Sequence, residues 1–181
     1  MTDRYSGYTE FVDSRGRALL RTACLLTGDR TEAEDALQDA LVKAAAKWPR
    51  INADGNPEPY VRKILYTVTI DRWRWRNRRI PEQLGSAPDR LSHRDPGHDV
   101  DQRLVVTAAL ARLTVRQRQV LVLRFYEDLT EAQTAHAMKC SVSTVKSQSR
   151  LALQRLRELA PELGDAFGTE TIENGTEEVR A

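Results

Sequence analysis

Apolar residues recur at helical spacing along the first part of the chain. Between Tyr8 and Thr27 they are Phe11, Ala18, Leu19, Thr22 and Leu26, which keeps one side of a helix dry. A turn signal follows at residues 28–29. A second helix is predicted to start at Thr31, because Thr31 and Glu34 have the spacing of a capping box. Its apolar stripe is Ala33, Leu37, Ala40, Leu41, Ala44 and Trp48, and its other side carries Asp35, Gln38, Asp39 and Val42.

Turn-forming residues then divide the chain. The stretch from Pro49 to Pro59 (PRINADGNPEP) is predicted to be a loop. A long basic helix is expected from Tyr60 to about Arg79. Residues 80–99 combine prolines and glycines with polar residues and are predicted to be a flexible linker.

Helical spacing returns after this linker. Helices are predicted over Val100–Arg112 and Thr114–Tyr126, then from Thr130 to a turn at residues 139–141, and finally to about Leu159. Thr114 with Gln117 and Thr130 with Gln133 have capping-box spacing. Residues 161–181 are acidic, lack periodicity and are predicted to be disordered.

The expected fold is therefore all-α, with two small helical domains joined by a flexible linker. The predicted boundaries are residues 1–79, 80–99, 100–160 and 161–181. The last helical pair has the spacing of a helix-turn-helix motif, with Ala135 at the helix crossing, Lys139 in the turn and Val145 pointing into the angle between the helices. The turn position favours glycine, so Lys139 carries a small strain cost.

Charge supports DNA as a partner. The net charge is only +2, but residues 60–79 carry seven basic side chains against Asp71 alone, and residues 141–157 carry four and no acid. On the second of these helices the outward residues are Ser143, Thr144, Lys146, Ser147, Gln148 and Arg150, which suit base edges and phosphates. The alternative is an ordinary packed pair of helices. The absence of acidic residues between positions 141 and 157 favours DNA binding.

Other classes of protein lack support in the sequence. No apolar run has the length of a membrane span, and no signal segment opens the chain, so a cytoplasmic location is expected. The two cysteines stand far apart and are expected to be reduced. There is no P-loop, metal-ligand spacing or nucleophile constellation, so we expect no enzyme, cofactor, metal or small-molecule substrate.

Several segments resemble the extracytoplasmic-function sigma factors of the sigma-70 family. LTGDRTEAEDALQDALVKAAAKWPRI is similar to region 2.2, YVRKILYTVTIDRWRWRNRR to regions 2.3 and 2.4, and the stretch with LRFYEDLT, TVKS and LQRLRE to region 4. The resemblance covers about residues 8–160, and the LLTGD segment suggests an actinobacterial subgroup. It implies a transcription initiation factor that binds core RNA polymerase, melts the −10 element and reads the −35 element.

The resemblance also implies roles for residues. Core polymerase would contact Glu34, Asp35, Gln38, Asp39 and Val42, and −10 DNA would contact Asn56, Arg72, Trp73, Arg74, Trp75, Arg76, Arg78 and Arg79. The six outward residues of the last helix would read −35 DNA. Trp73 and Trp75 point to nearly opposite sides of one helix, so at most one is expected to meet a base. Trp75 falls near Ile64 and Val68, which suggests a core position, whereas the resemblance places an apolar core residue at Trp73, so the choice between them stays open. Thr67 stands where family members often carry Asn. An anti-sigma factor is a common partner in this family.

Two alternative functions are also compatible with parts of the sequence. A stand-alone helix-turn-helix regulator would share the C-terminal motif, but it would leave the basic helix of residues 60–79 and the acidic helix before it unexplained. An inactive relative that only binds a protein partner is the second rival. DNA binding without core polymerase would favour the first of these.

Overall fold

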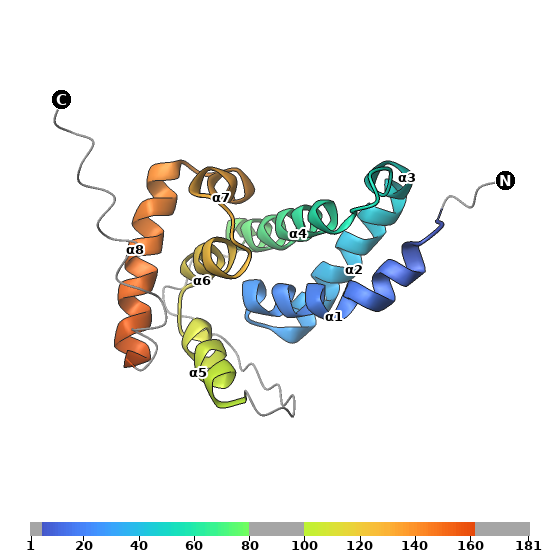
Figure 1. Cartoon of the computed structure of the whole chain (residues 1–181). Helices are drawn as coiled ribbons and strands as arrows, with labels where there is room; N and C mark the ends of the chain where they lie inside the picture. The colour runs from blue at the N-terminus through green and yellow to red at the C-terminus, as the bar shows by residue number, and fades with distance from the viewer. Residues whose placement is uncertain (1–4, 80–99, 162–181) are drawn as a thin grey trace.

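The structure is a computed structural model, and it describes residues 5–79 and 100–161 (Figure 1). The only regular secondary structure among these residues is helical, with turns between the helices and no strand, which confirms the all-α prediction. The helices are α1 Tyr8–Thr27, α2 Arg30–Ala46, α3 Trp48–Ile51, α4 Glu58–Arg79, α5 Val100–Ala111, α6 Val115–Leu121, the π-helical η1 Val122–Tyr126, α7 Glu131–Met138 and α8 Val142–Leu159. The predicted linker over residues 80–99 lies outside the described residues, and so does the predicted tail over residues 161–181 except for Pro161.

Helices α1 to α4 form the N-terminal unit (residues 5–79), in which α1, α2 and α4 pack together. Small residues on α2, such as Ala33 and Ala40, are fully buried and let the neighbouring helices approach closely. Trp48 closes one end of this core. It is 1% exposed, and its indole Nε1 donates a hydrogen bond of 2.8 Å to the carbonyl oxygen of Ser6.

Three details of the N-terminal unit differ from the prediction. Asp29, not Thr31, caps α2, and its carboxylate accepts a hydrogen bond from the backbone N–H of Glu32. The predicted loop from Pro49 to Pro59 begins instead with the short helix α3, because burial of Trp48 holds its start and proline suits the first turn of a helix. The basic helix α4 then starts at Glu58, two residues before the predicted position.

Helices α5 to α8 form the C-terminal unit (residues 100–161). Both predicted capping boxes are present, at Thr114 with Gln117 and at Thr130 with Gln133. The single helix expected over 114–126 is wrong in its second half, which is π-helical. There the N–H of Glu127 donates to the carbonyl of Val122 at 2.9 Å.

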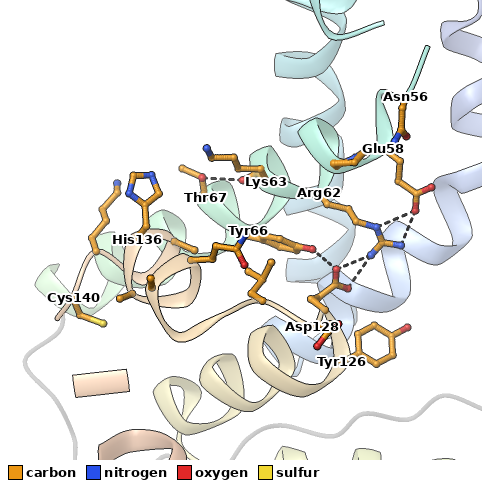
Figure 2. Close-up of a pocket in the computed structure, with 18 residues that line it drawn as sticks. Asn56, Glu58, Arg62, Lys63, Tyr66, Thr67, Tyr126, Asp128, His136 and Cys140 are labelled. Carbon is orange, nitrogen blue, oxygen red and sulfur yellow. Dashed lines mark hydrogen bonds and ion pairs between the residues drawn. The ribbon is translucent and has the colours of Figure 1, made fainter. Parts of the chain in front are cut away.

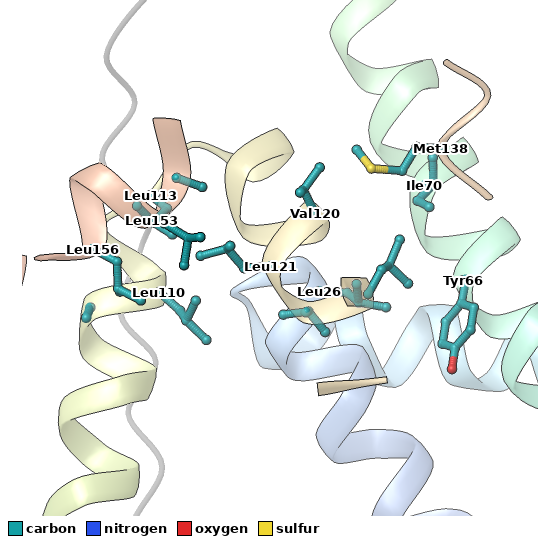
Figure 3. Packing of buried hydrophobic residues seen from close by; sticks show 14 of the residues in the cluster. Leu26, Tyr66, Ile70, Leu110, Leu113, Val120, Leu121, Met138, Leu153 and Leu156 are labelled. Atoms are coloured by element: carbon teal, nitrogen blue, oxygen red, sulfur yellow. The ribbon is translucent and has the colours of Figure 1, made fainter. Parts of the chain in front are cut away.

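The two units share a hydrophobic cluster, which the sequence did not predict. Leu26, Tyr66 and Ile70 of the N-terminal unit are buried in one cluster with Val120, Leu123, Met138 and other residues of the C-terminal unit. Figure 3 shows Leu26 beside the α6 residues and Met138 beside α4. Helix α6 packs on α1, and α7 packs on α4. The described residues therefore form one packed body.

Candidate nucleic-acid interface

Helices α7 and α8 form the predicted helix-turn-helix motif. Ala135 at the crossing is 5% exposed, and Val145 is fully buried. Lys139 ends α7 with φ 52°, the left-handed conformation that the sequence predicted as strained. Its ammonium group lies 2.6 Å from a carboxylate oxygen of Asp71 on α4. The turn that sets the angle of α8 is thus tied to the N-terminal unit.

The predicted −35 residues lie together over the first three turns of α8. Ser141 caps this helix, and its hydroxyl accepts from the N–H of Thr144 at 3.1 Å. Lys146 is 63% exposed and lies 3.7 Å from Glu131. The side chains of Gln148 and Arg150 have no hydrogen bond or ion pair within the described part of the chain. The remaining members of the predicted set, Ser143, Thr144 and Ser147, are on the same part of the helix, and this face can receive a polyanion without rearrangement.

The arginines of α4 are arranged differently. Arg72 lies between Asp39, at 2.5 Å, and Asp35, at 3.2 Å, and Arg76 pairs with Glu32. The structure therefore brings predicted −10 residues against predicted polymerase-binding acids of α2. These side chains are substantially exposed, so each pair contributes about 0–1 kcal/mol.

Other predicted −10 residues lie in the last turns of α4. The guanidinium of Arg74 donates to the carbonyl of Met138 at 3.4 Å, and Arg78 donates to the carbonyl of Arg74 at 3.4 Å. Arg79 ends α4, and its side chain lies outside the described residues.

The two tryptophans of α4 have different surroundings. Trp75 is 52% exposed, so of the two alternatives that the sequence left open, a core position for Trp75 is excluded. Trp73 is half-buried, and the guanidinium of Arg116 lies 5.9 Å from its ring centroid, within cation–π range. Trp75 is thus the ring with more surface to offer an unpaired base.

The predicted polymerase-binding residues form one exposed face of α2. Glu34, Asp35, Gln38 and Asp39 are exposed, and Val42 is 65% exposed. An apolar side chain this exposed beside carboxylates is suited to contact with a protein partner. Asp35 and Asp39 of this face are also the partners of Arg72, so docking at this face would engage carboxylates that already hold Arg72.

A groove of about 1440 Å³ lies along the contact between α4 and α7 and is lined by both helices. Asn56, the predicted base-binding residue, lies at one end of it, and Lys63 and Thr67 lie along its α4 wall. Figure 2 shows His136 and Cys140 on the opposite, α7 side. The groove therefore has one predicted −10 residue, Asn56, at its end, and α7 of the helix-turn-helix motif lies opposite its α4 wall.

Sequence reasoning missed a buried polar cluster between the two units. The side chain of Glu127 is 4% exposed and accepts from Thr22 at 2.8 Å and from Arg62 at 2.8 and 2.9 Å. It also accepts from the hydroxyl of Tyr66. Burial, together with the Glu127 carboxylate, raises the pKa of Tyr66. Although burial alone would lower the pKa of Arg62, its bonds to Glu58 and Glu127 raise it.

Arg118 is a second buried group between the units. It is 1% exposed, and its Nη2 donates to the carbonyl of Thr27 at the end of α1, at 2.7 Å. Burial lowers its pKa to about 10, so it stays protonated at neutral pH. Gly28 leaves the space it needs, since a Cβ there would lie 2.5 Å from the guanidinium carbon. The LLTGD segment contains Thr27 and Gly28, and the LRFYEDLT segment contains Glu127. Pairing over such sequence separations has no periodic signal.

Comparison with known proteins identifies the family. Residues 11–79 match sigma-70 region 2, and residues 109–158 match sigma-70 region 4. The RNA polymerase sigma-E factor of Streptomyces coelicolor is 35% identical over 153 residues, 83% of this chain and 84% of its own length. The ECF RNA polymerase sigma factor SigL of Mycobacterium tuberculosis is 31% identical over 161 residues, 84% of this chain and 88% of its own length.

A solved structure has the same fold. The sigma factor RpoE of Bartonella quintana, in complex with the anti-sigma factor NepR, matches with a TM-score of 0.64 at 24% sequence identity. The match covers 85% of this chain and 96% of that one.

The chain belongs to the sigma-70 family and is a transcription initiation sigma factor of the extracytoplasmic-function type. Such a factor binds core RNA polymerase and directs it to promoters. The alternative of a stand-alone helix-turn-helix regulator is not favoured, because the region 2 match accounts for the N-terminal unit. None of the helices in the described ranges has the length and apolar character that crossing a bilayer requires.

Proposed function

We propose that the two units divide promoter recognition, with the exposed half of α8 reading the −35 duplex and α4 holding the melted −10 strand. The carrying observation is the presence of two basic helices on different units, one of them bordered by exposed aromatic surface at Trp75. Lys146, Gln148 and Arg150 reach base edges and phosphates in the major groove. Arg74 and Arg78 neutralise the −10 strand, and Asn56 receives an unpaired base.

The acidic face of α2 is the proposed docking site for core polymerase. Asp35, Asp39 and Val42 are exposed there, and the carboxylates suit a basic surface on the polymerase. When polymerase binds the carboxylates of Asp35 and Asp39, Arg72 loses these partners and becomes available to DNA phosphates. Docking and −10 binding are therefore coupled through Arg72.

The protein acts without chemistry of its own, in the cytoplasm, as a subunit of polymerase holoenzyme. We also propose an anti-sigma factor as a partner, which is supported by the complex of the structural relative with the anti-sigma factor NepR. The proposed domain limits are residues 1–79 for core and −10 binding and 100–160 for −35 binding, with the linker between them and the tail after them.

Run-off transcription on genomic fragments tests the proposal. Core polymerase is compared with and without the full chain, and protein-dependent starts are expected with shared −35 and −10 sequences at one spacing. Tight, specific promoter binding by the protein alone, without any dependent start, would overturn the division of roles.

A further inference from the structure

One apolar side chain lies on the exposed side of the helix that is proposed to read −35 DNA. Leu151 of α8 is 43% exposed. The two residues that follow it, Ala152 and Leu153, are buried and belong to the hydrophobic cluster described above. The core side of α8 is therefore filled by other residues, and Leu151 contributes little to it.

Helical spacing places Leu151 in a row with proposed DNA-contacting residues. Residues four apart lie on the same face of a helix, and Ser143, Ser147 and Leu151 are all exposed. At a rise of about 1.5 Å per residue, Leu151 lies about 12 Å along the axis from Ser143. The major groove of DNA is about 12 Å wide, so a recognition helix that places Ser143 inside the groove still has Leu151 within reach of base edges. Figure 1 shows α8 at one edge of the molecule, with the other helices on one side of it.

The surroundings of Leu151 suit DNA better than a protein partner. Its exposed neighbours on α8 are polar or basic, namely Ser147, Arg150, Gln154 and Arg155. The other exposed apolar residue of α8, Val142, lies about 180° away around the helix at about 100° per residue. The centre of a protein interface gathers several apolar side chains, whereas Leu151 stands alone among polar groups. Such a side chain fits a partner that presents one small apolar group within a polar, anionic surface.

Thymine presents such a group in the major groove. All four bases show donors or acceptors there, and thymine alone adds a methyl group, at C5. The predicted −35 residues offer charges, hydroxyls and an amide, which pair with phosphates and with polar base edges. Among them only Thr144 carries a methyl group. It is half-buried, and its hydroxyl is hydrogen-bonded to Ser141 at 2.8 Å. Leu151 is thus the larger and more exposed apolar surface available to a thymine.

We propose that Leu151 determines specificity for thymine at one position of the −35 element, by packing its side chain against the C5 methyl group. This proposal rests on the proposed reading of −35 DNA by α8. Burial of one methyl group changes affinity by about 4-fold. Cytosine, the other pyrimidine, has no methyl group at C5 and presents an amino group instead of the O4 acceptor, so it loses the contact. The −35 element of this sigma factor therefore contains at least one thymine whose methyl group contributes to binding.

Removal of single methyl groups from the DNA tests this contact. Run-off transcription gives the −35 sequence, and each thymine of that duplex is replaced in turn by deoxyuridine, which lacks only the methyl group. Holoenzyme assembled with the full-length protein is then titrated with each duplex. Wild type should lose about 4-fold in affinity at one thymine. Leu151→Ala should bind the unmodified duplex about 4-fold or more weakly than wild type and lose nothing further at that thymine, because the two changes remove the same contact.

Two further variants serve as controls. Leu151→Met keeps an apolar side chain of similar size and should retain the sensitivity to deoxyuridine at the same thymine. Arg155→Ala removes an exposed side chain one turn further along α8, which donates to Glu158 at 2.7 Å, and should also retain that sensitivity. All three variants should bind core polymerase as tightly as wild type, because the proposed docking site lies on α2.

Equal affinity of wild type for every deoxyuridine duplex, or a −35 element without thymine, would overturn the role of Leu151. A deoxyuridine effect that persists in Leu151→Ala would do the same, because another side chain would then meet the methyl group. Weaker core binding by Leu151→Ala would assign this side chain to the polymerase instead. Failure of run-off transcription, or unchanged duplex affinity when Lys146 and Arg150 are both replaced by Ala, would count against the proposed function itself.

Discussion

Helices α4 and α8 both carry clustered basic side chains, but these side chains differ in how closely they are paired with acidic residues. On α8, Lys146 is mostly exposed and has only a 3.7 Å contact with Glu131. On α4, Arg72 already has two carboxylate partners and Arg76 has one. In the proposed function, α8 could therefore bind a duplex as it stands, whereas α4 would first have to exchange acidic partners for phosphates.

This difference gives the two readers different dependence on polymerase. A duplex can reach α8 with little rearrangement, since only exposed side chains meet it. In the proposed function, a −10 strand would have to displace the ion pairs of Arg72 and Arg76 on α4. We therefore expect recognition of the −10 element to depend more strongly on the rest of the holoenzyme, and the predictions below test the proposed roles of α8, α2 and α4.

The largest effect is expected from Lys146→Ala combined with Arg150→Ala. Each side chain supplies about 1–3 kcal/mol of DNA contact, so holoenzyme binding to a −35 duplex should weaken by about 2–6 kcal/mol. Gel-shift titration measures this loss. Affinity for core should stay unchanged, with Arg155→Ala at the far end of α8 as control. An equal loss of core binding would contradict the assignment of α8.

Charge reversal on α2 should have the next largest effect. Asp35→Lys with Asp39→Lys places like charges against a basic partner and against Arg72, and should weaken core binding by about 2–3 kcal/mol. Fluorescence titration with core polymerase provides the measurement. Asp13→Lys, an exposed acid of α1, is the matched control. If the reversed protein binds core as tightly as wild type, the α2 face is not the docking site.

The two tryptophans should separate in binding of the −10 strand. Trp75→Ala should cost the holoenzyme about 1–3 kcal/mol of affinity for a single-stranded −10 oligonucleotide, the range for one stacked base. Trp73→Ala should cost less, because Arg116 already lies over its ring. Competition binding with labelled oligonucleotides compares them. A larger loss for Trp73 would reverse the assignment.

The smallest effect concerns the paired arginine. Arg78→Ala should lower the salt dependence of −10 strand binding by about 0.7 in the log–log slope, the value for one phosphate contact. Arg72→Ala should lower it less when α2 is free, because the pairs with Asp35 and Asp39 must break before Arg72 reaches DNA. Titrations of the full chain at several salt concentrations, without core, give both slopes. Equal slopes would show that the ion pairs do not matter.

The sequence predicted local features of the fold better than contacts between the units. Helix α1 has the predicted bounds, and both capping boxes form, because spacing and capping depend on residues within one turn. The cap of α2 moved to Asp29 because two acceptors compete there within three residues. The π-helical turn was missed, since residues 122–126 are as apolar as an ordinary buried helix.

The candidate site divides in the same way. Exposure of the α8 face followed from periodicity, as did that of the α2 face. The contacts of Arg72 with Asp35, of Arg118 with Thr27 and of Glu127 with Arg62 join residues far apart in sequence. Charge alone allows many such pairings. The packing of α2 on α4 selects the contact of Arg72 with Asp35, and the shared cluster that includes Leu26 and Tyr66 selects the other two.

The π-helical turn η1 also makes the interface sensitive to chain length. A π-helical turn amounts to one residue inserted into an α-helix, and each residue turns an α-helix by about 100°. Deleting one residue within Val122–Tyr126 would restore regular helix and swing Glu127 away from Arg62. A single codon thus decides whether the buried carboxylate that joins the two units meets its partners, with the basic residues of α4 and α8 unchanged.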